Sequence, residues 1–284
     1  MSLNQANRSG NILKMVTFMI VALGLGFFTI IGSSAMQQAS ALDQSHMLWT
    51  TTRSANVLRD LAKSVLDSGD TIIFHYSSTG APTSTQITAL KAVTNVPNSH
   101  KGFEFFSLAA IKKYAPVAKE NGFGFIAYDL EDGSSPSSEV SNPVTSFKNA
   151  ASIAHSYGLK LIATPGYPIL TNYATQFARY VDGVHMQTQR LQNDDLDCKT
   201  MKNFVVSMVS KLESAKSSLA GHIVYQTTFS RFTAGDKTIY NTQKDCIDAV
   251  SPTSVDGLFI WWTGASYDSG DYQKLLKYHE SKYS

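Results

Sequence analysis

Short apolar runs alternate with segments of helical spacing along most of this chain. The runs that read as buried strands cover residues 71–77, 103–106, 123–129, 159–164, 181–189, 222–230 and 255–263. Helical spacing of apolar residues occupies 107–121, 147–157, 200–219 and 272–279. Such an alternation predicts an α/β protein with a parallel sheet and helices outside it. One strand and one helix recur about every 30 to 40 residues, and this period and the total length favour a (β/α) barrel of seven or eight parallel strands over an open sheet.

The segments between these runs add two expectations. Gly122, Gly158 and Gly221 each stand just before a predicted strand, where the turn from helix to strand commonly needs a positive φ. Residues 43–70 are expected to form an N-terminal helix that covers the bottom of the barrel or its first strand.

The stretch Phe123–Asp132, FGFIAYDLED, is the most informative segment for chemistry. A buried strand ends there in a group of acids, and a Gly-Ser-Ser-Pro loop follows. Because strand side chains alternate, Ala127, Asp129 and Glu131 share one face. If this face points into the barrel, two carboxylates lie at its C-terminal mouth, where barrel enzymes hold their active sites. The simpler alternative is a solvated strand end without function.

Polar and aromatic residues at other strand ends would face the same mouth. The candidates for substrate binding are Tyr76, His185, Gln187, Gln189, Gln226 and Trp261. Amides, hydroxyls and an indole together are typical of a sugar-binding lining, because apolar sugar faces stack on aromatic rings. Each residue taken alone has a structural alternative. His185 can be a satisfied core histidine, and Gln187 and Gln189 can fill a barrel layer and hydrogen-bond each other.

The segments IAYDLE, GLKLIATP and VDGLFIWW resemble the glycoside hydrolase class of TIM barrels, and most nearly the family 18 chitinase-like group. In that group a strand ends in Asp-x-Asp-x-Glu, and the last strand carries an inward Trp that stacks on sugar. Asp129, Glu131 and Trp261 match the last two acids and the Trp, whereas Ala127 stands in place of the first acid. The chain also resembles uncharacterised secreted bacterial and archaeal barrel proteins. The resemblance implies a TIM-like barrel that acts on a poly- or oligosaccharide.

Three functions remain open on these residues. The first is a glycoside hydrolase with Glu131 as the acid and Asp129 beside it. Both stand on one wall, so they do not flank a bond; either the substrate's acetamido group serves as the nucleophile, or Asp194, Asp195 or Asp268 supplies a second carboxylate. The second is a non-catalytic carbohydrate-binding barrel, as Ala127 hints. The third is a metal-dependent hydrolase using Asp129, Glu131 and His185, although paired histidines are lacking.

Charge and composition exclude several other classes. The chain has 24 basic and 22 acidic residues, and leaving out residues 1–41 removes Arg8 and Lys14 and leaves 22 of each. This balance and the lack of a basic cluster argue against nucleic-acid binding. No motif indicates a cofactor, and none indicates a strong metal site.

The first 41 residues have the pattern of a targeting segment. Two basic residues precede an apolar run over residues 15–32, and Ala39-Ser40-Ala41 matches a cleavage site. We expect a secretory leader or an uncleaved membrane anchor, with residues 42–284 forming one domain outside the cytoplasm. The membrane would then be contacted only through the N-terminal segment.

Two cysteines, Cys198 and Cys246, are present. Outside the cytoplasm a disulfide between them is the default expectation, with two separate buried thiols as the alternative.

Overall fold

The computed structural model describes residues 47–52, 55–75, 80–194, 198–228, 237–261 and 270–283. The residues from Gln44 to Ser284 form one compact unit. Within the described residues of this unit, eight parallel strands pair in sequence order, and β8 pairs with β1 to close a barrel. The predicted (β/α) barrel is therefore confirmed, with eight strands.

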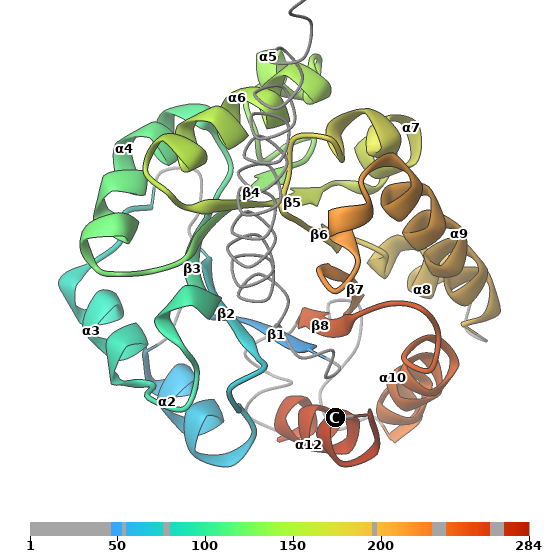
Figure 1. Ribbon diagram of the computed structural model, residues 1–284. Coiled ribbons are helices and arrows are strands. Elements are labelled where there is room, and N and C mark those ends of the chain that lie inside the picture. Colours follow the sequence, from blue (N-terminus) through green and yellow to red (C-terminus); the bar gives the residue numbers. More distant parts are fainter. Residues whose placement is uncertain are drawn as a thin grey trace, which may run out of the picture. The chain divides into compact units, whose positions relative to one another are not determined.

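The strands occupy the centre of the unit, and the helices form a ring around them (Figure 1). The strands are β1 (Met47–Thr52), β2 (Thr71–His75), β3 (Lys101–Phe105), β4 (Phe125–Leu130), β5 (Lys160–Pro165), β6 (Gly183–Met186), β7 (Ile223–Thr228) and β8 (Gly257–Trp261). The helices are α2 (Ala55–Ser64), α3 (Ser84–Ala92), α4 (Leu108–Glu120), α5 (Ser137–Val140), α6 (Pro143–Ser156), α7 (Tyr167–Phe177), α8 (Gln189–Asp194), α9 (Lys199–Ala215), α10 (Lys237–Val250) and α12 (Asp271–Tyr283). Short 3₁₀ turns cover Asn98–His100 and Ser217–Leu219.

The structure corrects one expectation, which concerns the start of the barrel. Residues 43–70 were expected to form a helix, but Met47–Thr52 is the first strand and only Ala55–Ser64 is helical. The sequence MLWTTT is short and rich in Trp and Thr, which favour strands. Its place in the barrel depends on pairing with both β2 and β8, which a local pattern does not show.

The two faces of the strands bury different kinds of side chain. The outward face packs against the helices in a large apolar core, which includes Tyr128 of β4 and Phe147 of α6. The inward face forms a separate small apolar cluster of Ile73, Phe125, Ala127, Ile162, Val224 and Phe259. Since side chains alternate, the next inward residues toward the strand ends include His75, Asp129 and Gln226. The barrel interior is thus apolar below and polar near the C-terminal ends.

Local turn geometry follows the sequence expectation. Gly122, Gly158 and Gly221 have φ values of 75°, 69° and 83°, a conformation that favours glycine.

The two cysteines are joined by a disulfide, with their Cα atoms 5.0 Å apart. Cys198 caps the N-terminus of α9 and Cys246 lies within α10, so the bond ties two neighbouring helices of the ring. The predicted pairing is confirmed, and it fits an oxidising compartment.

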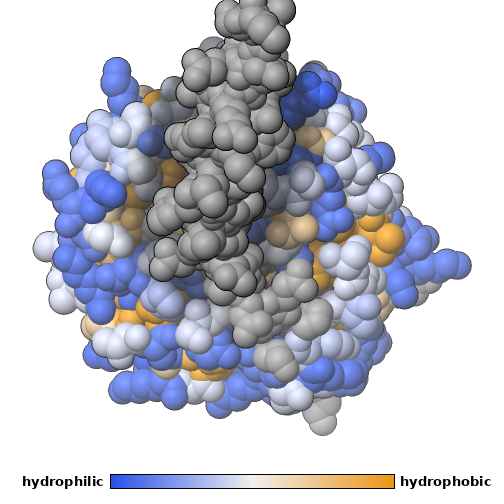
Figure 2. Space-filling model, in the orientation of Figure 1, coloured by the Kyte–Doolittle hydropathy of each residue, from blue (hydrophilic) through white to orange (hydrophobic). Residues whose placement is uncertain are grey.

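On the visible face of the unit, hydrophobic residues appear in small separate groups among hydrophilic ones (Figure 2). No helix in the described part of the chain combines the length and apolar character needed to cross a bilayer. The predicted leader, residues 1–41, lies outside the described residues.

Candidate functional site

A pocket of about 350 Å³ opens inside the barrel, where the strands end. Its lining comes from β2, β3, β4, β6, β7 and β8 and from the loops that follow β3, β4 and β6. This is the end of a (β/α) barrel at which ligands bind and catalysis takes place. The pocket is therefore the candidate site.

The end of β4 contributes Asp129 and Glu131. Asp129 is buried at the pocket wall, and Glu131 stands just beyond the strand, partly exposed. The turn after Glu131 is tight: the Ser135 hydroxyl accepts a hydrogen bond from the Glu131 N–H at 3.2 Å and donates one to the Asp129 carbonyl at 2.9 Å. The Ser134 hydroxyl donates to the Glu131 carboxylate at 2.8 Å. This turn positions both acids toward the pocket, as the alternation in FGFIAYDLED predicted.

Glu104 of β3 brings a third carboxylate to the same wall. In the strand register Glu104 lies opposite Ala127, one inward position before Asp129. His75 of β2 donates from Nδ1 to the Glu104 carboxylate at 2.6 Å, and both side chains are buried. The rings of Phe106 and Trp261 stand edge-on to the His75 imidazole, at 5.1 and 5.3 Å between centroids. The imidazole is thus held in place by an acid and two aromatic rings.

Two neighbouring carboxyl groups in this wall have opposite pKa shifts. Burial opposes the ionisation of Glu104, but the hydrogen bond and charge of His75 outweigh it and hold the Glu104 pKa below its usual value. Burial, then the charges of Glu104 and Glu131, raise the Asp129 pKa well above its usual value, although the Gln187 amide opposes this. The wall therefore holds one carboxyl group that loses its proton more readily than usual, Glu104, next to one that holds its proton more tightly, Asp129.

The remaining walls carry amides, a histidine and aromatic rings. Gln187 Nε2 donates to Asp129 at 2.7 Å, and Gln189 Nε2 donates to Gln187 at 3.3 Å, so the two amides form a chain that ends on the acid. His185 packs on Phe259 at 4.0 Å between ring centroids, and burial lowers the His185 pKa to about 4. A neutral imidazole results.

The structure places most of the sequence-predicted site residues around this one pocket. Asp129, Glu131, His185, Gln187, Gln189, Gln226 and Trp261 all line it. Tyr76, Asp195 and Asp268 lie outside the described residues, as does the side chain of Asp194. The roles assigned to these residues stay predictions.

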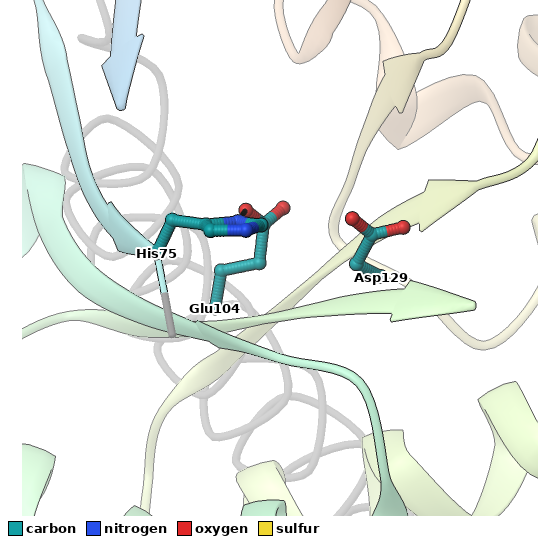
Figure 3. A group of neighbouring side chains, drawn as sticks. All are labelled: His75, Glu104 and Asp129. Atoms are coloured by element: carbon teal, nitrogen blue, oxygen red, sulfur yellow. Dashed lines mark hydrogen bonds and ion pairs between the residues drawn. The ribbon is translucent and has the colours of Figure 1, made fainter. Parts of the chain in front are cut away.

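Neither Glu104 nor His75 was among the candidate site residues that the sequence indicated. The signal for Glu104 was an acid inside the apolar run Phe103–Phe106, which is costly to bury unless the acid has a partner. The metal alternative from the sequence named Asp129, Glu131 and His185. The group whose ligand atoms lie within 4.8 Å of one another is instead His75, Glu104 and Asp129 (Figure 3).

Comparison with known proteins gives likeness in fold only. No family model and no curated protein sequence matches the chain. The catalytic domain of a family 18 chitinase from the fern Peteris ryukyuensis is similar at a TM-score of 0.53 and 14% identity, over 81% of this chain and 99% of that one. A family 18 chitinase from Crocus vernus is similar at a TM-score of 0.51 and 9% identity, over 82% of this chain and 98% of that one. The tryptophan synthase α-subunit of Pyrococcus furiosus has a TM-score of 0.47 and 11% identity, over 84% of this chain and 97% of that one. The two chitinase likenesses, together with the closed strand order, show that the chain folds as a TIM barrel.

Proposed function

We propose that this barrel is a carbohydrate-active enzyme that hydrolyses glycosidic bonds, with Glu131 as the general acid. The observation that carries the proposal is the pocket itself. Carboxyl groups from β3 and β4 stand on one wall, and Trp261, Gln187 and Gln226 stand on the others. Sugars are bound by such combinations, because an indole stacks on the apolar sugar face while amides pair with hydroxyls.

The position of the acids bears on the type of hydrolysis. Glu104, Asp129 and Glu131 come from two adjacent strands, whereas β7 and β8 across the barrel contribute Gln226, Phe259 and Trp261 to the pocket. Among the described residues, no carboxyl group faces these three acids from the far wall. A mechanism with two carboxylates flanking the bond needs one on each side. The arrangement favours a substrate-assisted route.

In that route Glu131 transfers its proton to the glycosidic oxygen as the bond to C1 breaks. The oxygen of the substrate's own 2-acetamido group forms the new bond to C1, and Asp129 orients that group. Water then adds to C1 as the bond from C1 to the acetamido oxygen breaks, and its proton passes to Glu131, which restores the acid. The substrate class expected is therefore an oligosaccharide of 2-acetamido sugars.

Glu104 supplies a carboxylate near the position where Ala127 replaces the first acid of the family pattern. Ala127 lies in the apolar layer of the barrel interior, where the resembled family has its first acid. Glu104, its register partner on β3, brings a carboxylate oxygen within 4.8 Å of Asp129. Asp129, which matches the second acid of the family pattern, thus still has an acidic neighbour. This supports a catalytic site over one that has lost its activity.

The test is a screen of the purified protein on chromogenic glycosides and polysaccharides with and without 2-acetamido groups. Glu131→Gln should lower turnover by at least about 100-fold, the lower end for losing a general acid. Asp132→Asn is the matched control, because Asp132 is an exposed neighbour that does not line the pocket. Trp261→Ala should mainly raise KM. Activity on glycosides in general, but none that depends on the acetamido group, would contradict the substrate-assisted route.

A non-catalytic carbohydrate-binding barrel is the second candidate, favoured by Ala127 in place of an acid. It predicts saturable binding without turnover, retained in Glu131→Gln and lost in Trp261→Ala. A protein that shows neither sugar binding nor turnover would contradict both candidates.

We also propose that residues 42–284 act as one domain outside the cytoplasm, with residues 1–41 as a leader or anchor. The disulfide between Cys198 and Cys246 supports this location.

A further inference from the structure

We propose that His75, Glu104 and Asp129 bind a divalent transition-metal cation at the floor of the pocket. The three side chains come from the consecutive strands β2, β3 and β4 and converge inside the barrel (Figure 3). One ligand atom from each lies within 4.8 Å of the other two, and all three residues are buried. Two ligand atoms bound about 2.0–2.2 Å from one ion lie at most about 4.4 Å apart, so only small side-chain adjustments are needed to bring the three donors onto one ion. Rigid strands therefore already hold a set of three donors together.

The histidine has the arrangement expected of a metal ligand. Its Nδ1 lies 2.6 Å from a Glu104 carboxylate oxygen, and the hydrogen bond between these two atoms is one that a cation bound by both would replace. Nε2 is buried and has no hydrogen-bond partner among the described residues. In Figure 3 the His75 imidazole and the Glu104 carboxylate lie together, and the Asp129 carboxylate stands next to them on the following strand.

The charges around the group also call for a cation. Three carboxyl groups, those of Glu104, Asp129 and Glu131, line the pocket, and no Lys or Arg does so among the described residues. The other facing groups are His75, which already pairs with Glu104, and His185. Buried acids without a fixed cation are costly, and a bound ion is one of the ways in which proteins offset that cost.

The donor set indicates the class of ion. Gln187 holds one oxygen of Asp129 at 2.7 Å and so fixes the orientation of the carboxylate. One imidazole with two carboxylates suits Zn²⁺ or Mn²⁺, whereas Mg²⁺ and Ca²⁺ prefer oxygen donors alone. The ion would neutralise the acids and leave its other coordination positions open to the pocket. Glu131, which is outside the group, keeps its proposed role as the general acid. Asp129 belongs to both proposals, so metal binding is tested without sugar.

The test uses the full chain without an affinity tag, dialysed against a chelator and titrated calorimetrically with Zn²⁺, Mn²⁺ and Mg²⁺ in the absence of sugar. We expect saturable binding of one Zn²⁺ or Mn²⁺ per chain and much weaker binding of Mg²⁺. Glu104→Gln, Asp129→Asn and His75→Gln should each weaken binding by more than about 10-fold, and Gln187→Leu by at least about 10-fold as an outer partner. Asp132→Asn and His155→Gln are the matched controls, because Asp132 and His155 are exposed and do not line the pocket.

A second measurement keeps the proposal testable if a buried variant does not fold. Anomalous scattering from crystals of the wild-type protein soaked in Zn²⁺ should place the ion between His75, Glu104 and Asp129. Absence of saturable binding, an ion located elsewhere, or folded Glu104→Gln and Asp129→Asn variants that bind as tightly as Asp132→Asn would each overturn the proposal. Because no sugar is used, a failed glycoside screen leaves this result unaffected.

Discussion

Two aspartates at equivalent places in the barrel show how neighbours set a pKa. Asp182 stands before β6 and Asp256 before β8, each in a Val-Asp-Gly sequence. Each carboxylate accepts a hydrogen bond from a backbone N–H at or next to the start of the neighbouring strand. Asp182 accepts from Leu161 at 2.9 Å, and Asp256 accepts from Ile223 at 2.8 Å. Burial opposes the ionisation of Asp182, but His155 at 2.6 Å and other partners lower its pKa overall. At Asp256 burial is the largest influence, and together with the charge of Glu213 it raises the pKa to about 6, although backbone N–H groups oppose this.

The raised pKa predicts a pH-dependent stability. The folded-state pKa of Asp256 is about 6, against an ordinary aspartate pKa of 3.8, so the folded protein holds this proton more tightly than the unfolded chain. Wild-type stability should therefore fall as the pH rises from about 4 to about 6, because ionised Asp256 disfavours folding. Asp256→Asn keeps an acceptor for Ile223 and lacks this titration. Its urea midpoint relative to wild type should rise across the same interval.

Asp182→Asn is the matched control for this experiment. The Asp182 pKa is lowered, so its contribution is present above the unfolded-state value and is lost only at more acidic pH. That variant should be less stable than wild type throughout the interval from about pH 4 to about pH 8. A midpoint difference between Asp256→Asn and wild type that does not change with pH would contradict the assignment to Asp256.

At the level of single residues, the site was only half predictable. Asp129 and Glu131 could be found because a strand ending in acids is a local pattern. Glu104 looked like part of a weak strand, and its importance comes from His75 and Asp129, which lie on other strands. His75 and Glu104 are 29 residues apart in sequence, so a pattern of neighbouring residues does not show that they are partners.

Secondary-structure elements were more predictable than their ends. The apolar runs located β2 to β8, and the helical spacing located α4, α6, α9 and α12. The first strand was missed, since Met47–Thr52 carries no alternation of apolar and polar residues that would mark it. Its strand identity depends on the hydrogen bonds to β2 and β8 that close the barrel.

The disulfide gives a prediction at this scale, because it joins α9 and α10. The bond closes a loop with a sequence separation of 48, for which the chain-entropy model gives a stabilisation of about 4 kcal/mol. Cys198→Ser with Cys246→Ser should lower the free energy of unfolding by about 2–4 kcal/mol, as measured by urea denaturation. Reduced wild type should match the double variant. Equal stability of oxidised and reduced protein would show that the bond contributes nothing to the fold.

For the whole molecule, the compact unit from Gln44 to Ser284 predicts an autonomous barrel. A protein lacking residues 1–43 should fold with the same thermal midpoint and the same near-ultraviolet circular dichroism as the full chain. N-terminal sequencing of protein recovered from an expression host tests the leader, with cleavage after Ala41 as the expected result. Loss of cooperative unfolding in the shortened protein would contradict the domain boundary.

The sequence by itself determined the α/β alternation and which residues of β4 share a face, and it made one disulfide the default expectation. Alternation along a strand and apolar spacing along a helix are set by neighbours in the chain, so a local pattern contains them. Only the tertiary structure decided which acids meet. The register that sets Glu104 opposite Ala127 also brings Glu104 beside Asp129, and the closure of β8 on β1 completes the ring on which Trp261 stands near His75. Register and closure depend on hydrogen bonds between distant segments, and this is why the chemistry of the pocket could be read only from the folded chain.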